Sequence, residues 1–282
     1  MRAVSELRQE FCFQALLRLA KIPKSSYYHT LKQLSRPDRY EQERADILLI
    51  FNRNGGKYGH RRIRIELQKL GHRISNKKVL SLMRGEGLFC RVRMKKYQSY
   101  RGEVGKIAPN LLERDFAAEA PNQKWVTDIT EFGLFGEKLY LSPILDLFNS
   151  ELVSFSISER PIYAQVADML DQAFAKIPDG TDLIFHSDQG WQYQMFHYQR
   201  RLKEKGIRQS MSRKGNCLDN AVMENFFGIL KSELLYLYEF KSMAEFRVAL
   251  EDYLDYYNNV RIKAKLKGLS PVQYRIQSLQ AA

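Results

Sequence analysis

Apolar side chains recur at helical spacing near the start of the chain. A spacing of three to four residues places them on one face of a helix, and Pro23 then interrupts the pattern. Residues 6–34 are therefore predicted to form two helices within an N-terminal helical segment, residues 1–40. The apolar positions of the first helix are Leu7, Phe11, Ala15, Leu16 and Leu19, and those of the second are Tyr28, Leu31 and Leu34.

A second helical set covers residues 41–88 and has glycine-rich turns between its segments. Ser75 is predicted to cap the last helix, because a serine oxygen can accept a bond from the free N–H groups of a helix start. This order is typical of a helix–turn–helix domain whose last helix enters a DNA major groove. An ordinary three-helix bundle with a basic, solvated face is the alternative. The polar face of the last helix carries Lys77, Lys78, Ser81 and Arg84.

Strand and helix patterns alternate from residue 118 to the end, which predicts one α/β domain over residues 118–282. Three strands come first and strand–helix units follow, so we expect a mixed sheet flanked by helices. Strands are predicted over residues 124–132, 138–146, 152–158, 182–186 and 207–211. Helices are predicted over residues 164–176, 193–205, 219–235 and 242–258.

Three acids stand out in this domain. Asp128 lies inside an apolar, β-branched run, where an unpaired carboxylate is costly. Asp188 follows the apolar run Leu183-Ile184-Phe185, at the strand end where α/β sheets bind ligands. Glu224, with 35 residues between it and Asp188, is one turn into a predicted helix. Taken singly, each acid has an ordinary structural role as its alternative; together they predict a catalytic, metal-binding site.

The chemistry of these acids favours a particular cation. Carboxylates without a histidine or cysteine partner select Mg²⁺ or Mn²⁺ over zinc. Two such ions activate a water or a 3′-hydroxyl and stabilise the leaving oxygen during phosphoryl transfer. His186 lies close to Asp188 in sequence. It could tune that acid, orient substrate or simply pack in the core.

Lys231 is the candidate cation of the same helix. It follows Glu224 by seven residues, and seven steps of 100° place the two side chains within ~20° on one face, ~10 Å apart along the axis. Gly228 lies on that face between them, where a polymer can approach. We therefore predict that Lys231 contacts a DNA phosphate; a solvated helix lysine is the alternative.

The net charge of +13 is concentrated in the first part of the chain. Residues 1–114 carry 26 Lys and Arg against 10 Asp and Glu, whereas residues 115–282 carry 19 against 22. Such a basic half favours a polyanionic partner, with a basic surface kept for solubility as the alternative. Residues 89–117 are predicted to be a basic linker that follows a phosphate backbone, or a plain linker.

Other sequence features narrow the environment. The three cysteines are far apart and form no CxxC pair, so a zinc site or a disulfide framework is not predicted. No apolar run reaches the ~20 residues of a membrane span. We therefore expect a cytoplasmic protein.

The motifs resemble those of the IS-three family of bacterial insertion-sequence transposases, second-frame products with a retroviral-integrase-like DDE core. The resemblance runs from about residue 6 to the end. The segments that carry it are Trp125 to Thr130, His186 to Gly190, Ser212 to Ala221, Glu224 with Lys231, the terminal stretch from Tyr257 to Asn259 through Leu269 to Pro271 and Tyr274, and Tyr58 to Ile63, which resembles the family's helix–turn–helix. The resemblance also implies a bacterial, nucleoid-associated protein.

This resemblance implies an RNase H-like, five-stranded mixed sheet preceded by an all-α helix–turn–helix region. It also implies Mg²⁺-dependent DNA cleavage and strand transfer, with Asp128, Asp188 and Glu224 as catalytic metal ligands. Lys231 would contact the DNA end. Arg61 and Arg62 are further DNA-binding candidates. The expected partners are double-stranded DNA (element ends and target), further copies of the chain on DNA, and an upstream-frame product as a fusion or partner.

Two other functions fit the residues. One is an RNase H-like nuclease that cuts DNA without strand transfer. The other is a DNA-binding regulator with an inert core, which the presence of all three acids disfavours. Strand joining separates the transposase from the nuclease, and metal-dependent cutting separates either enzyme from the regulator.

Overall fold

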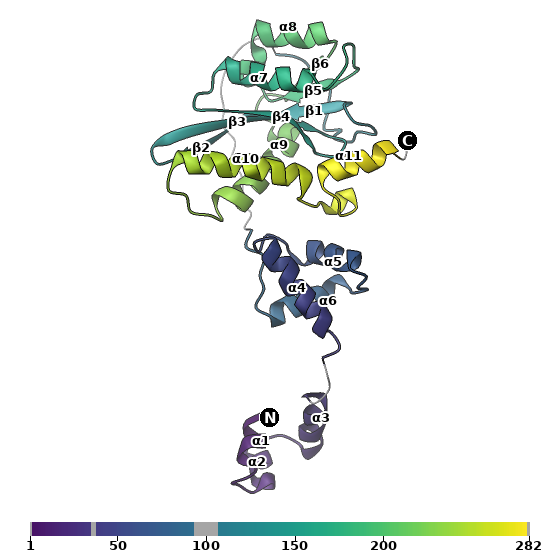
Figure 1. Ribbon diagram of the computed structural model, residues 1–282, viewed down its shortest axis with the longest axis vertical. Helices are drawn as coiled ribbons and strands as arrows, with labels where there is room; N and C mark the ends of the chain where they lie inside the picture. Colours follow the sequence, from purple (N-terminus) through teal and green to yellow (C-terminus); the bar gives the residue numbers. More distant parts are fainter. Residues whose placement is uncertain (1, 35–37, 93–106, 281–282) are drawn as a thin grey trace. The chain divides into compact units, whose positions relative to one another are not determined.

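The computed structural model describes residues 2–34, 38–92 and 107–280 (Figure 1). By its internal contacts the chain divides into two compact units, Met1–Asp46 and Ile47–Ala282, and each is described by itself. Much of the predicted basic linker, residues 93–106, lies outside the described residues. No helix of the described ranges is both long and apolar enough to cross a bilayer.

The N-terminal unit contains α1 (Arg2–Leu7), α2 (Phe13–Leu19) and α3 (Lys24–Leu34), so the sequence prediction of two helices over residues 6–34 was wrong. Helix α1 ends at Leu7, within the range predicted for one helix, and the chain turns before α2 begins at Phe13. This turn lets Val4, Leu17 and Tyr27 meet in one small core. One continuous helix could not fold α1 back against α2. The local spacing of apolar residues does not show this turn, so it predicted a single helix.

Three helices, α4 (Glu41–Arg53), α5 (His60–Lys69) and α6 (Asn76–Gly85), form the helix–turn–helix region as predicted. The Ser75 side chain accepts a hydrogen bond from the Lys78 N–H, which confirms the predicted cap. Ile47, Ile63 and Val79, one from each helix, are buried. The apolar face of each helix thus supplies the core, and the basic positions are left for the surface.

The sheet of the α/β region contains β1 (Lys124–Thr127), β2 (Thr130–Leu134), β3 (Glu137–Asp146), β4 (Leu152–Ser158), β5 (Ile184–Ser187) and β6 (Arg208–Met211). β3 pairs antiparallel with β1, β2 and β4, while β1–β5 and β5–β6 are parallel. The pairs Thr127↔Ile144 and Thr130↔Leu141 share one register. β1 and β2 are thus one strand interrupted at Asp128 and Ile129, and with that strand counted once the sheet has the five predicted strands.

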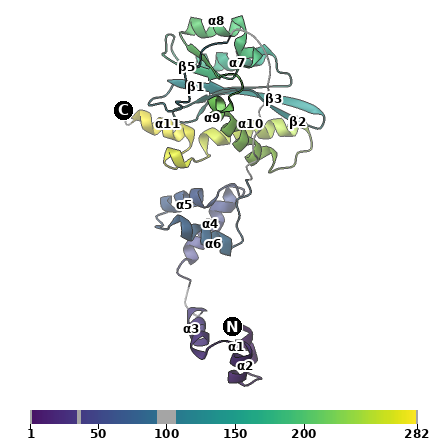
Figure 2. The same ribbon diagram turned by 180° about the vertical axis from the view of Figure 1, so that it is seen from behind.

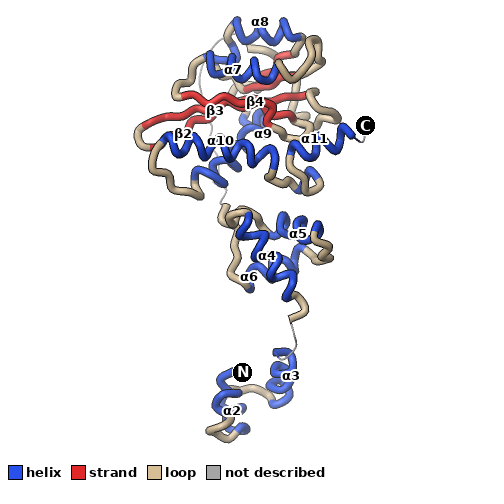
Figure 3. Tube along the Cα trace, viewed as in Figure 1, coloured by secondary structure: helices blue, strands red, loops and turns tan. Residues whose placement is uncertain are grey.

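Helices cover both faces of this sheet (Figures 1 and 2). α7 (Tyr163–Phe174) and α8 (Phe196–Lys205) lie on one face, and α9 (Ala221–Leu230) and α10 (Met243–Asn259) lie on the other (Figure 3). Trp125 packs in the core between the sheet and α7 and α8, and its neighbour Val126 packs in the core between the sheet and α9 and α10. Successive strand residues point to opposite faces, which explains this difference. The chain ends with α11 (Pro271–Gln280), which packs against α10.

Candidate active site and metal centre

Asp128 lies at the break between β1 and β2. By the continuous register it lies opposite Pro143, which has no N–H to donate to the ladder. The Ile129 N–H instead donates to Asp128 Oδ1 at 2.7 Å. The Asn220 side-chain amide donates to Asp128 Oδ2 at 2.9 Å. Both carboxylate oxygens are thereby held in one orientation.

Asp188 immediately follows β5, the parallel neighbour of β1. Thr127 and Ser187 are paired in register, so the residues that follow them, Asp128 and Asp188, leave the sheet side by side. The Gly190 N–H donates to Asp188 Oδ1 at 2.8 Å. Adjacent strand ends therefore bring together two acids that are 60 residues apart in sequence.

Burial raises the pKa of Asp128 well above its usual range, and the nearby charge of Asp188 raises it further. The charge of Glu224 adds a smaller increase in the pKa of Asp128. Burial likewise raises the pKa of Asp188 and of Glu224. Among the described residues, none of the three acids forms an ion pair, although the charge of Lys231 is near enough to act on Asp128.

Glu224 reaches this site from the first turn of α9. Within the described ranges, no three His, Cys, Asp or Glu side chains are gathered closely enough to hold one ion as they stand. The two aspartates are the close pair, and Glu224 is near enough for its charge to act on Asp128. The three acids supply oxygen donors only, which fits a hard divalent cation.

Lys231 follows α9 as the first residue of η3 (Lys231–Leu235), a π-helical segment. Its ammonium lies 5.5 Å from the centre of the Phe132 ring. Burial lowers the pKa of Lys231, and the charges of Asp128 and Glu131 partly offset this. The charges of Asp128 and Glu131 thus act on Lys231, and its shared face with Glu224 stays a prediction.

Comparisons with known proteins identify the family of this chain. Families described as integrase core domains match residues 118–217 and 224–279, and an HTH-like domain family matches residues 38–96. The putative transposase InsK of insertion sequence element IS150 from Escherichia coli is 53% identical over 99% of this chain and 98% of its own length. The chain belongs to the IS-three family of insertion-sequence transposases.

Another E. coli relative, transposase InsF for insertion sequence IS3A, is 33% identical to this transposase over 98% of each chain. Among solved structures, the HTLV-2 integrase catalytic core domain in complex with magnesium matches with a TM-score of 0.44 and 18% identity, covering 56% of this chain and 99% of that one. A chain of the simian T-cell lymphotropic virus intasome in complex with PP2A regulatory subunit B56 gamma matches with a TM-score of 0.47 and 20% identity, covering 75% and 73%.

The DNA-binding candidates of the transposase separate into two groups. Lys77 and Arg84 are exposed on α6 and Lys78 is partly exposed, so this helix presents a basic face to solvent. Arg61 is exposed on α5. Its neighbour Arg62 instead donates to the carboxylate of Glu233 at 3.3 Å, beside η3.

His186 packs inside the transposase core. Its Nδ1 is 2.8 Å from the Ser210 hydroxyl and its Nε2 is 3.1 Å from the Ser212 hydroxyl. Burial lowers the pKa of His186 to about 4, so the ring is neutral at physiological pH. Of the three roles considered for His186, this geometry supports packing.

Sequence reasoning did not single out Asp219 and Asn220 as site residues. Asp219 accepts hydrogen bonds from three donors of Arg213 and from Arg114 and Asn110, and the Arg213 bonds hold the pKa of this carboxyl well below its usual range. This anchor precedes Asn220, which holds Asp128. The adjacent pair Asp219-Asn220 at a helix start was the available signal, because such residues favour caps and turns.

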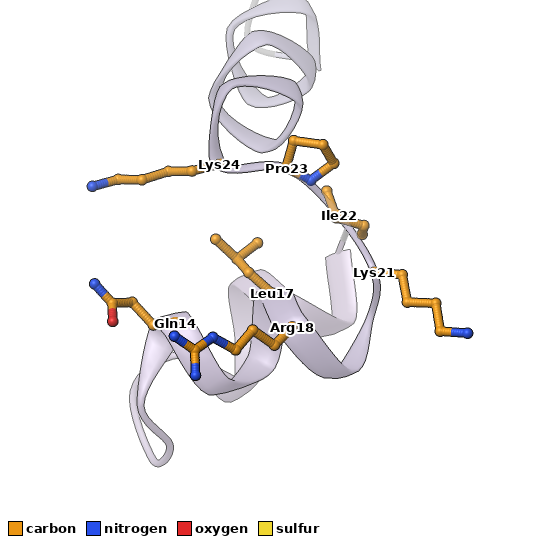
Figure 4. Close-up of a pocket in the computed structure, with 7 residues that line it drawn as sticks. All are labelled: Gln14, Leu17, Arg18, Lys21, Ile22, Pro23 and Lys24. Atoms are coloured by element: carbon orange, nitrogen blue, oxygen red, sulfur yellow. The ribbon is translucent and has the colours of Figure 1, made fainter.

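A hollow of about 510 Å³ lies in the N-terminal unit and is unrelated to the acids (Figure 4). It is open to solvent, and three of its side chains are cationic. No acid lines it, so it adds nothing to the candidate active site. Its lining residues are Gln14, Leu17, Arg18, Lys21, Ile22, Pro23 and Lys24.

Proposed function

We propose that the transposase cleaves the ends of its element and joins them to target DNA, with Asp128, Asp188 and Glu224 as the ligands of two Mg²⁺ or Mn²⁺ ions. The observation that carries this proposal is the pair of aspartates at adjacent parallel strand ends, and burial raises the pKa of both carboxyls. When bound, the ions supply a nucleophile and stabilise the leaving oxygen.

The protein's own contribution is to hold the donors in place. The Ile129 N–H and the Asn220 amide orient Asp128, and the Gly190 N–H orients Asp188. Prearranged ligands lose little freedom when the ions and the DNA phosphate arrive. Glu224 needs only its side chain to move, because its backbone is set by α9.

The direct test is a strand-transfer assay with full-length protein, Mg²⁺ and a labelled, pre-cut element end. Joined products support a transposase. Cutting without joining supports the RNase H-like nuclease, and DNA binding without any cutting supports the inert regulator.

The charge of the chain supports DNA as a partner. Double-stranded DNA, at the element ends and at the target, meets the basic face of α6, and the positive first half of the chain strengthens that attraction. We also propose that several copies assemble on DNA, that an upstream-frame product is a fusion or partner, and that the protein works in the bacterial cytoplasm.

Lys231→Ala should lower strand transfer by roughly 10- to 100-fold, because a charge-assisted bond to phosphate contributes about 1.5–3 kcal/mol. The measurement is joining of a pre-cut end, with Lys241→Ala, an exposed lysine, as the matched control. Mg²⁺ affinity should stay unchanged. Equal joining rates for the two variants would show that Lys231 only covers the Phe132 ring.

The double change Lys77→Ala and Arg84→Ala should weaken DNA binding uniformly and reduce the slope of log affinity against log salt by about two, one for each lost phosphate contact. The control removes Arg200 and Lys203, two exposed cations of α8. Fluorescence anisotropy at several salt concentrations gives both slopes. A salt slope of the α6 variant equal to that of the wild type would mean that α6 only presents a solvated basic face.

A further inference from the structure

Glu233 is a buried acid that the proposed chemistry does not use. It lies in η3, nine residues after Glu224 on the same continuous helical segment. Its carboxylate accepts hydrogen bonds from Arg261 Nε and Nη2, both at 2.7 Å, and from the Tyr253 hydroxyl at 3.0 Å. The fourth donor is Arg62 Nη1 at 3.3 Å, and Arg62 belongs to α5 of the helix–turn–helix region.

Arg62 is part of a wider contact between that region and the residues around η3. Its guanidinium lies 5.2 Å from the Tyr58 ring centre, and the Tyr58 hydroxyl accepts from the Ile262 N–H at 3.4 Å. A side chain at Gly268 would overlap Cγ2 of Ile65, so the backbone approaches α5 closely there. The Lys57 ammonium lies 5.1–5.7 Å from the ring centres of Tyr238, Tyr253 and Tyr256.

The charges show that Arg62 is not needed to neutralise Glu233. Arg261 already forms a two-bond pair with this carboxylate, and both side chains of that pair are only 3% exposed. Arg62 is therefore a second cation on a satisfied acid. Burial, followed by the charges of Arg261 and Arg62, lowers the pKa of nearby Lys263 to about 7, so Arg62 adds to the positive charge that Lys263 meets.

We propose that Arg62 is a positioning residue of the transposition reaction: by binding Glu233 it holds the helix–turn–helix region against the segment that continues the catalytic helix. This inference rests on the proposed function, in which α6 binds DNA and Glu224 serves the cleaved phosphate. Glu224 and Glu233 are joined by roughly 13 Å of helix. A fixed contact at Glu233 therefore sets the distance along the DNA between the bound segment and the cut phosphate.

The variant Arg62→Gln tests this role, with Lys69→Gln as its matched control. Both remove one positive charge from α5, but Lys69 is exposed and pairs with Glu66 of its own helix. The fold should survive in both, because Arg261 and Tyr253 still satisfy Glu233. Arg62→Lys keeps a cation for Glu233 and should partly restore the wild-type behaviour, and Lys57→Ala, which removes the second anchor, should resemble Arg62→Gln.

The first readout maps the cut phosphates on end-labelled element DNA at single-nucleotide resolution. For Arg62→Gln, cutting at the main phosphate should fall by about 10- to 100-fold while neighbouring phosphates gain product, since a misplacement of ~1 Å costs about 100-fold. Lys69→Gln should keep the wild-type pattern. An unchanged pattern for Arg62→Gln, whatever its overall rate, overturns the proposal, as does a loss of DNA affinity alone.

The second readout needs no cleavage and so separates this inference from the proposed function. Spin labels on non-natural residues at positions 68 and 248, which are exposed on α5 and α10, report the distance between the two regions without DNA. Arg62→Gln should broaden the narrow wild-type distribution, and Lys69→Gln should not. Equal widths overturn the inference even if the wild type cleaves DNA; a wild type that never cleaves overturns only the proposed function.

Discussion

Asp188→Asn is expected to lower Mg²⁺-dependent cleavage and joining by about 1,000-fold or more, because loss of a metal ligand removes several kcal/mol of charge stabilisation. The amide oxygen can still accept from the Gly190 N–H, so the loop should keep its conformation. The lost charge also relieves the repulsion that raises the pKa of Asp128. DNA affinity at matched ionic strength should remain nearly the same.

The matched control is Asp182→Asn, which removes the same charge just before β5. Asp182 pairs with Arg208 on the surface, and its side chain is 83% exposed, so this variant should cleave and join like the wild type. The measurement is product formed per unit time from one labelled element end. Equal activity of Asp188→Asn and the wild type would contradict the assignment of the acids.

Glu233→Gln is expected to reduce the free energy of unfolding by about 3–5 kcal/mol, because it leaves the buried Arg261 guanidinium without its counter-charge. Arg261 and Glu233 are both only 3% exposed. Urea unfolding can be followed by the fluorescence of Trp125, which is buried in the sheet. The control Glu251→Gln removes a surface partner of Arg247 and should change stability by less than ~1 kcal/mol.

The pH dependence gives a second check on Glu233. Burial raises the pKa of Glu233, but the bonds and charge of Arg261 outweigh burial, so the net shift is downward. A carboxyl with a lowered folded-state pKa binds fewer protons when folded than when unfolded. Its stabilisation is present above the unfolded-state pKa of ~4.3 and is lost as pH falls through the folded-state value. The stability difference between wild type and Glu233→Gln should therefore shrink below about pH 4; a constant difference would mean that the charge is not responsible.

Local pattern predicted most elements well but could not find the break in the first strand. Residues 124–132 look like one strand because their apolar and β-branched side chains are continuous. The interruption at Asp128 depends on Pro143 standing opposite it on β3, and register between strands is a tertiary property. The same break frees Asp128 from the ladder, so the detail missed in the fold is the one that shapes the site.

The contacts of Arg61 and Arg62 also could not be predicted from the sequence. As adjacent cations of one helix they are indistinguishable in sequence, and both were expected to bind DNA. The packing of α5 beside η3 distinguishes the two arginines, because it places Arg62 against the buried carboxylate of Glu233. Adjacent helix residues point about 100° apart, so one can face a neighbour while the other faces solvent.

The sequence by itself determined the α/β class, the helix–turn–helix region and the family, and it singled out the three candidate acids, since periodicity, caps and motif spacing are local properties. The tertiary structure alone decided which side chains meet. It placed Asp128 beside Asp188 through parallel pairing, turned Asn220 toward Asp128 and joined Arg62 to Glu233 across 171 positions. Such contacts depend on strand order, register and burial, which arise only when distant segments pack together.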